Sequence, residues 1–210
     1  MSNIKVSLNV IMDASGSMAP LREDTIKGFN GFLEEQKSLP GEAYLTLCVF
    51  NTESNFVCKF KPLKEVKNLS NNDYYPMGGT ALLDAIGQTI ENTKSEIYSM
   101  KEEDRPSKVL FMIITDGEEN SSRNYKHEVI KQMVTKAQQE EAIPWEFIFV
   151  GAQSIDAISV GNSIGVVQNN AVKYTADAVG TNHLYESMTR GVSEYRSNNF
   201  AFNANIFNKS

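Results

Sequence analysis

The sequence has little of what marks a disulfide-stabilised or nucleic-acid-binding protein. Its 210 residues include two cysteines and two histidines, and the formal net charge is -6. Two cysteines are too few for the disulfide framework of small secreted domains. A negative protein with no dense run of lysine and arginine repels phosphate backbones, so nucleic acid is not expected as a partner.

Targeting and membrane signals are also missing. The first residues, MSNIKVSLNVIMDAS, have no basic start, no signal-type apolar stretch and no small-residue cleavage site. No apolar run elsewhere approaches the length of a bilayer span. We therefore expect a cytoplasmic protein that does not bind membranes, and most simply a monomer. A hydrophobic content of 41% in 210 residues supports one substantial core and is short for two.

Strand-like and helix-like segments alternate along the chain. Strand patterns cover residues 4–12, 43–50, 55–60, 109–115, 145–150 and 171–174. Helical spacing covers residues 26–33, 82–97, 129–137, a short stretch from about 154, and 184–195. Such alternation predicts a Rossmann-like, doubly wound, mostly parallel α/β sheet with helices on both faces. We assign residues 1–197 to one domain, while the Asn- and Phe-rich tail 198–210 has no clear period and stays unassigned.

The segments 43–50 and 55–60 are joined by a short polar turn, which predicts a hairpin and hence one antiparallel edge strand. A register that pairs Phe50 with Phe56 would place Cys48 directly opposite Cys58. We nevertheless favour two buried free thiols, because a disulfide needs an oxidising compartment.

Three polar loops are predicted at the carboxyl ends of the strands, where open α/β sheets bind their ligands. The first loop follows the first strand, the second opens the helix after two glycines, and the third ends the buried strand 109–115. Together they offer two carboxylates and three hydroxyls, and small residues let the backbone bend beside them. The oxygen-bearing residues are Asp13, Ser15, Ser17, Thr80 and Asp116, and the adjacent glycines are Gly16, Gly79 and Gly117.

Hard oxygen donors without histidine or cysteine suit Mg²⁺, with Mn²⁺ or Ca²⁺ as substitutes, and disfavour zinc. Two carboxylates balance the charge of a divalent ion, while hydroxyls add none. A position left open on such an ion would attract an incoming Asp or Glu side chain. The donor set therefore predicts a binding site with a preference for carboxylates.

The segments D-A-S-G-S, G-G-T and T-D-G, in this order and on these elements, resemble the metal-ion-dependent adhesion site (MIDAS) of von Willebrand factor A (vWA) domains. GGTALLDAIGQTIE, FVGAQSIDAISVGNSIGV and YTADAVG also resemble small vWA proteins of bacteria and their phages. The resemblance covers nearly the whole chain. It implies that Ser15, Ser17 and Thr80 contact a metal directly, that Asp13 and Asp116 often act through water, and that the partner is a protein.

Several acids near these loops have two interpretations. Asp84 lies one turn into the helix after Thr80, where it supports the metal loop by a hydrogen bond or is an ordinary acid at a helix start. Glu118, Glu119 and Asn120 either sort partners by charge or open a helix. Asp156 either shapes the rim of the site or caps a helix, and the cap is favoured.

An enzyme is the competing class, as a Mg²⁺-dependent hydrolase or phosphotransferase. Position 15 is serine where a haloacid-dehalogenase-type site needs a second acid, and the sequence has neither a GxxxxGK[ST] phosphate loop nor GxGxxG. The histidines, His127 and His183, lie outside the three loops, so no base for a serine nucleophile is expected there. The G-x-S-x-G match at 161–165 follows a short helix instead of a strand. We therefore expect a non-enzymatic adhesion or adaptor module, or alternatively a phage or bacterial assembly component whose metal only stabilises the fold.

Overall fold

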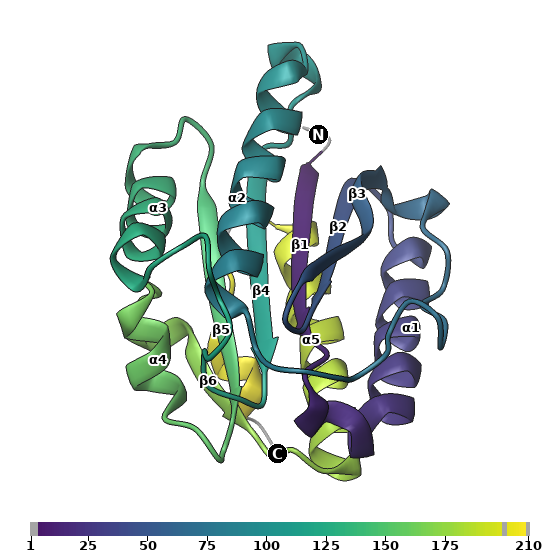
Figure 1. Cartoon of the computed structure of the whole chain (residues 1–210). Coiled ribbons are helices and arrows are strands. Elements are labelled where there is room, and N and C mark those ends of the chain that lie inside the picture. Colours follow the sequence, from purple (N-terminus) through teal and green to yellow (C-terminus); the bar gives the residue numbers. More distant parts are fainter. Residues whose placement is uncertain (1–3, 199–200, 209–210) are drawn as a thin grey trace.

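A six-stranded sheet lies at the centre of the computed structural model, which describes residues 4–198 and 201–208 (Figure 1). The strands are β1 (Lys5–Asp13), β2 (Glu42–Phe50), β3 (Ser54–Pro62), β4 (Lys108–Thr115), β5 (Trp145–Ala152) and β6 (Ala171–Tyr174). Their order is β3-β2-β1-β4-β5-β6, and β3 alone among them runs antiparallel to its neighbour. The predicted doubly wound sheet with an antiparallel edge strand is confirmed.

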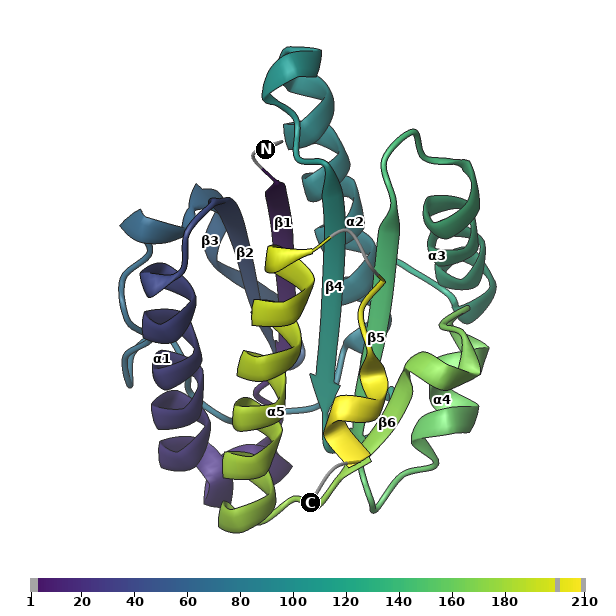
Figure 2. The ribbon, with the colours of Figure 1, turned by 180° about the vertical axis from the view of Figure 1, so that it is seen from behind.

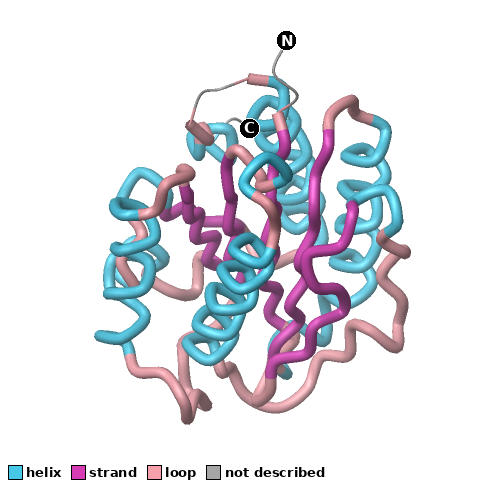
Figure 3. The backbone as a smooth tube through the Cα atoms, turned by 90° about the horizontal axis from the view of Figure 1, so that it is seen from above, coloured by secondary structure: helices cyan, strands magenta, loops and turns pink. Residues whose placement is uncertain are grey.

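Two layers of helices cover the sheet. The helices are α1 (Arg22–Ser38), α2 (Leu82–Ser99), α3 (His127–Glu140), α4 (Ala157–Ser163) and α5 (Ala178–Ser197). The helices α1 and α5 lie on one face and α2, α3 and α4 on the other, as the opposed views of Figures 1 and 2 show. Figure 3 shows the strands enclosed between them. No helix within residues 4–198 and 201–208 combines the length and the apolar character needed to cross a bilayer.

The central strand β1 is buried on both faces, and its side chains alternate between the two cores. Val10 and Met12 join the cluster under α1 and α5, whereas Ile11 joins the cluster under α2. The polar residue Asn9 is also buried, and its amide is satisfied because Thr93 Oγ1 on α2 donates to its Oδ1 at 2.7 Å. Buried polar groups need such partners, so this contact fixes α2 against the sheet.

The carboxyl ends of β1 and β4 lie side by side, since Met12 pairs with Ile114 in parallel register. Asp13 therefore emerges next to Thr115, and α2 begins at the same edge of the sheet. The three loops that the sequence singles out are thereby brought to one place.

The segment after α5, which has no period in sequence, packs into the core. Phe202, Ile206 and Phe207 are buried in the cluster under α1 and α5. Its backbone is also anchored, because Phe202 N donates to Glu146 Oε2 at 2.7 Å and Lys108 Nζ donates to the carbonyl of Asn198 at 2.6 Å.

The expected hairpin register is wrong. The structure pairs Cys48 with Phe56 and Leu47 with Cys58, with irregularities in between. Phe50 pairs with Ser54, two residues before Phe56, because Asn51 Oδ1 accepts from Glu53 N at 3.1 Å and shortens the turn. Both cysteines are free thiols; Cys48 is buried and Cys58 is half-buried.

Candidate metal centre

Asp13, the last residue of β1, is the buried centre of the site. Its side chain is 0% exposed and accepts two hydrogen bonds, from Ser15 N to Oδ1 at 2.7 Å and from Thr115 Oγ1 to Oδ2 at 2.5 Å. Its carbonyl accepts from Tyr74 Oη at 2.7 Å. These contacts hold the carboxylate in one orientation at the end of the strand.

The two serines of the first loop connect it to the third loop. Ser15 Oγ lies 3.0 Å from Ser17 Oγ, and Ser17 Oγ donates to Asp116 Oδ1 at 2.9 Å. Ser15 is buried, Ser17 is exposed and Asp116 is half-buried. Oxygen atoms from residues about a hundred positions apart in sequence therefore face one another at the molecular surface.

The loop before α2 is clamped between the other two. Gly16 N donates to Gly78 O at 3.1 Å, and Met77 N donates to Ala14 O at 2.9 Å. Gly78 has a φ of +69°, a conformation that favours glycine. A side chain at Gly79 is excluded because its Cβ would lie 2.2 Å from Ser121 Oγ.

Thr80 is buried at the end of this clamped loop. Its N–H donates to Asn120 Oδ1 at 2.8 Å, and its carbonyl accepts from Asn120 N at 3.0 Å. Its Oγ1 would lie 3.4 Å from a Cβ built on Gly117, the neighbour of Asp116. The structure thus brings all three predicted loops together, with Thr80 beside the third.

The electrostatics of the two carboxylates are unusual for a protein surface. Burial, assisted by the charge of Asp116, raises the pKa of Asp13 to about 6 even though hydrogen bonds from Thr115 and Ser15 oppose the shift. Burial likewise raises the pKa of Asp116. Within the described chain, neither carboxylate forms an ion pair with a basic side chain. Two neighbouring acids without a cation are the arrangement that a bound metal ion would stabilise.

Asp84 accepts hydrogen bonds from the chain that follows the third loop. Its carboxylate accepts backbone hydrogen bonds from Arg123 at 3.0 Å, Asn124 at 2.9 Å and Tyr125 at 2.9 Å. Burial acts to raise its pKa, but these hydrogen bonds outweigh burial and lower it. Asp84 therefore positions residues 123–125, and its carboxylate is directed at them and away from Ser15 and Ser17.

Glu119 has a similar role from the other side. Its Oε2 accepts from Leu83 N at 2.9 Å in the first turn of α2, and its Oε1 accepts from Ser121 N at 2.9 Å and Ser122 N at 2.7 Å. The prediction that Glu118, Glu119 and Asn120 open a helix is wrong, because α3 begins at His127; Glu119 instead satisfies an N–H group at the start of α2. Asp156 caps α4 by accepting from Ser159 N at 3.3 Å, which confirms the favoured interpretation. Glu118 is exposed.

Three residues that sequence reasoning did not single out also hold the site. Thr115 donates to Asp13, Tyr74 donates to the Asp13 carbonyl, and Ser154 Oγ donates to the Asp116 carbonyl at 3.1 Å. Thr115 has a visible signal, since it precedes Asp116 in the T-D-G segment. Tyr74 has none: it lies in an irregular polar stretch and is nevertheless 0% exposed.

The G-x-S-x-G segment does not form a nucleophile elbow. Ser163 is the last residue of α4, and its Oγ donates to Val160 O at 2.7 Å within that helix. The distance from Ser163 Oγ to His127 Nδ1 is 3.5 Å, and both residues are exposed. A hydroxyl committed to its own helix lacks the strand-turn-helix geometry of an activated serine.

Comparison with known proteins identifies the fold. No protein-family model and no curated protein matches the sequence. Proximal thread matrix protein 1 (PTMP1) from the mussel byssus is similar in structure, with a TM-score of 0.65 and 13% identity over 91% of this chain and 48% of that one. A von Willebrand factor type A protein from Catenulispora acidiphila has a TM-score of 0.60 and 12% identity over 90% of this chain and 43% of that one.

A further structure of PTMP1, described as having a zinc-occupied MIDAS motif, has a TM-score of 0.60 and 15% identity over 90% of this chain and 46% of that one. The chain therefore spans less than half the length of these structures. At such identities the likeness establishes architecture: the chain has the von Willebrand factor A-type fold.

Proposed function

We propose that this protein is a divalent-cation-dependent protein-binding module, of the adhesion or adaptor kind. The proposal rests on one observation: Ser17 Oγ contacts both Asp116 Oδ1 and Ser15 Oγ, beside the buried Asp13. It is supported by the vWA-type fold and by the zinc-occupied MIDAS motif of PTMP1.

The donor set fits a hard divalent cation. In the described ranges, no cluster of three or more His, Cys, Asp or Glu side chains is placed to hold a metal, so a site here depends on hydroxyl oxygens. The two carboxylates have raised pKa values and no basic partner, which a divalent cation would correct. We propose Mg²⁺, with Mn²⁺ or Ca²⁺ as substitutes, because oxygen-only sites suit these ions.

The cation would be held by the five predicted residues, Asp13, Ser15, Ser17, Thr80 and Asp116. When bound, it supplies a positive position that attracts a carboxylate of a partner. Other residues of the chain position these ligands. Thr115 and Ser15 N orient Asp13, and the clamped backbone around Gly78 and Gly79 sets the position of Thr80. Asp84 and Glu119 hold the chain after the third loop in place.

The partner is accordingly a protein that presents Asp or Glu. We also propose that the protein is of the small bacterial or phage type, that it is cytoplasmic, and that it is a monomer. The chief alternative is an assembly component whose cation only stabilises the fold. A hydrolase has less support, because the hydroxyls of Ser15 and Ser17 contact each other and Asp116, and within the described residues no histidine or lysine is among their hydrogen-bond partners.

The first test is a Mn²⁺ titration followed by electron paramagnetic resonance, with Mg²⁺ and Zn²⁺ as competitors. We expect one site in the wild type and at least about tenfold weaker binding in Asp116→Ala, since one charged ligand contributes more than 1.4 kcal/mol. Glu118→Gln is the matched control, because it removes an exposed acid from the same edge and leaves the ligand set intact. Equal losses in both variants, or no Mn²⁺ site in the wild type, would contradict the assignment.

The second test separates adhesion from stabilisation. Immobilised wild type and Asp116→Ala are compared for capture of cellular proteins in Mg²⁺ and in EDTA, with thermal unfolding measured in parallel. Capture that depends on Mg²⁺ and on Asp116, with the fold intact in EDTA, supports a binding module. Capture unchanged by EDTA, together with a lower unfolding temperature, identifies a structural cation. Turnover of generic phosphate or ester substrates that Ser15→Ala abolishes would favour a hydrolase.

A further inference from the structure

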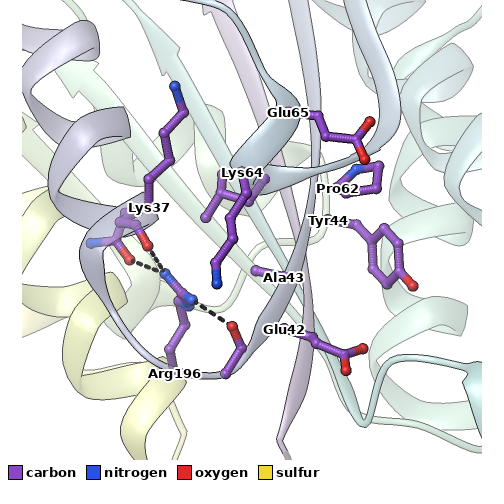
Figure 4. A pocket seen from close by; sticks show the side chains of 11 residues that line it. Lys37, Glu42, Ala43, Tyr44, Pro62, Lys64, Glu65 and Arg196 are labelled. Atoms are coloured by element: carbon purple, nitrogen blue, oxygen red, sulfur yellow. Dashed lines mark hydrogen bonds between the residues drawn. The ribbon is translucent and has the colours of Figure 1, made fainter.

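A pocket of about 370 Å³ lies at the opposite end of the sheet from the candidate metal centre. It is bordered by the end of α1, the start of β2, the end of β3 and the last turn of α5, and Figure 4 shows its side chains. The start of β2 pairs with Lys5, whereas its end pairs with Asp13. Eight residues of strand at about 3.3 Å each therefore separate the two ends by about 26 Å. A volume of this size is within the range that binds small molecules.

The floor of the pocket carries a buried positive charge. Arg196 is 7% exposed, and its guanidinium donates to Gln36 O at 2.5 Å, to Gln36 Oε1 at 3.1 Å, and over longer distances to Pro40 O and Gly41 O. All four acceptors are neutral. In the part of the chain that the structure describes, no carboxylate forms an ion pair with Arg196. Its hydrogen bonds are satisfied, but its charge is not neutralised.

A second cation reaches the same part of the pocket. Figure 4 shows the Lys64 side chain extending toward the side where Arg196 lies. The ammonium of Lys37 points away from Arg196, and it is 2.9 Å from Glu34 Oε1. The carboxylates of Glu42 and Glu65 lie on the far side of the pocket in Figure 4. Glu42 is paired there with Lys5, whose Nζ lies 3.8 Å from its Oε2, so the cations Arg196 and Lys64 lie on one side of the pocket and Glu65 with the paired Glu42 on the other.

The wall between the two sides is largely apolar. It is formed by Ala43, Leu63 and Pro62, whereas the Tyr44 ring stacks on Phe60 in the cluster on the other face of the sheet, with centroids 4.5 Å apart. A ligand that lies along this wall gains from burying a hydrocarbon or aromatic surface. The acidic side beyond the wall disfavours a second negative charge on the same ligand.

We propose that this pocket binds a small organic monoanion, with its carboxylate against Arg196 and Lys64 and its apolar body along Ala43, Pro62 and Leu63. A carboxylate there would supply a counter-charge to the buried guanidinium, whose Nη1 and Nη2 already donate to neutral oxygen atoms. The pocket is independent of the metal centre, because it contains none of the predicted ligands and its own ligand is held by cations.

Benzoate is a suitable probe, and benzamide is its neutral counterpart of nearly the same shape. Calorimetric titrations are run in EDTA, so that benzoate cannot bind through a cation at Asp116. We expect benzoate to bind and benzamide to bind at least about tenfold more weakly, since the charge-assisted contacts are lost. Comparable binding of both molecules, or no binding of benzoate, overturns the proposal.

Variants of Lys64 test the cationic side without disturbing the core, because this residue is exposed. Lys64→Met is expected to weaken benzoate binding about tenfold, as for one charge-assisted hydrogen bond, and Lys64→Arg to retain it. Lys67→Met is the matched control, since Lys67 is an exposed lysine outside this pocket. Equal weakening in the Lys64→Met and Lys67→Met variants would mean that only the general charge matters, and would overturn the site.

Amide chemical shifts locate the probe. Benzoate is expected to shift the signals of Gly41, Ala43 and Lys64, with those of Ser15 and Thr80 unchanged. Shifts confined to the metal-centre loops would overturn the proposal, whereas the proposed function would stand or fall separately on the Mn²⁺ titration.

Discussion

The two ends of the central sheet carry charges of opposite sign. At the carboxyl ends of the strands lie the buried Asp13 and Asp84 and the half-buried Glu119, whereas at the amino ends lie the buried Lys108 and Arg196. Helix direction accounts for the difference. In a doubly wound sheet the helices begin at the carboxyl edge and end at the amino edge, so free N–H groups gather at one edge and free carbonyls at the other.

Most of these charged side chains form hydrogen bonds with the helix ends themselves. Glu119 accepts from Leu83 N at the start of α2, while Lys108 donates to the Tyr195 carbonyl and Arg196 to the Gln36 carbonyl near the ends of α5 and α1. Asp13 differs, since its nearest charge is the acid Asp116. The comparison shows that Asp84 and Glu119 are matched by backbone N–H groups, whereas Asp13 interacts electrostatically with another acid.

The largest expected effect is at the amino edge, in Arg196→Met. This change leaves the Gln36 carbonyl and its neighbours without their donor, and we expect the free energy of unfolding to fall by about 4 kcal/mol. Urea denaturation followed by circular dichroism measures it. Arg190→Met on the same helix is the control, because the contact of Arg190 is a 3.4 Å hydrogen bond to Ser187 Oγ. Similar losses in both variants would show that Arg196 does not act through the end of α1.

The next effect is at the carboxyl edge, in Asp84→Ala. The N–H groups of Arg123, Asn124 and Tyr125 lose their acceptor, and the expected loss is about 3 kcal/mol by the same denaturation measurement. Asp84→Asn keeps one acceptor oxygen and should lose less. If Asp84→Ala left stability unchanged but removed Mn²⁺ binding, Asp84 would belong to the metal centre and the contrast with Asp13 would be wrong.

The smallest expected effect is an increase in stability, in Asp13→Asn. Burial raises the pKa of Asp13 from its ordinary 3.8 to about 6, so the metal-free folded state holds this proton more tightly than the unfolded chain does. Ionisation therefore destabilises the metal-free fold progressively as the pH rises from about 4 to about 6. Asparagine removes this cost, and since Thr115 Oγ1 also contacts Gly117 O at 3.1 Å, it can accept from the new amide.

In EDTA at pH 7.5, Asp13→Asn should be more stable than the wild type by at most about 3 kcal/mol, given 1.36 kcal/mol per pKa unit. The gain should shrink toward zero near pH 4, which paired urea titrations at the two pH values would measure. A gain of the same size at both pH values would show that ionisation of Asp13 is not its cause. In Mg²⁺ the order should reverse, because the wild type alone keeps its charged ligand.

Local sequence patterns were sufficient for the architecture. Apolar runs such as 109–115 could be recognised as buried strands, and the alternation with helical spacing predicted the parallel sheet and its antiparallel edge. The hairpin register was not recoverable, because the Asn51 side chain shortens the turn and the strands then pair through irregularities. The tail was missed because Phe202 and Phe207 pack by tertiary contact and follow no period.

The sequence by itself determined which residues stand at the carboxyl edge, since strand ends and loops are encoded locally. Asp13, Ser15, Ser17, Thr80 and Asp116 could therefore be named, and the structure places their loops together. Only the tertiary structure decided which acids accept hydrogen bonds from distant backbone N–H groups. Asp84 and Glu119 do, whereas Asp13 has the acid Asp116 nearby. The tertiary structure also decided where Tyr74 and Arg196 lie, since their partners are backbone carbonyls distant in sequence. Charge matching depends on distances across the fold, and no local pattern records them.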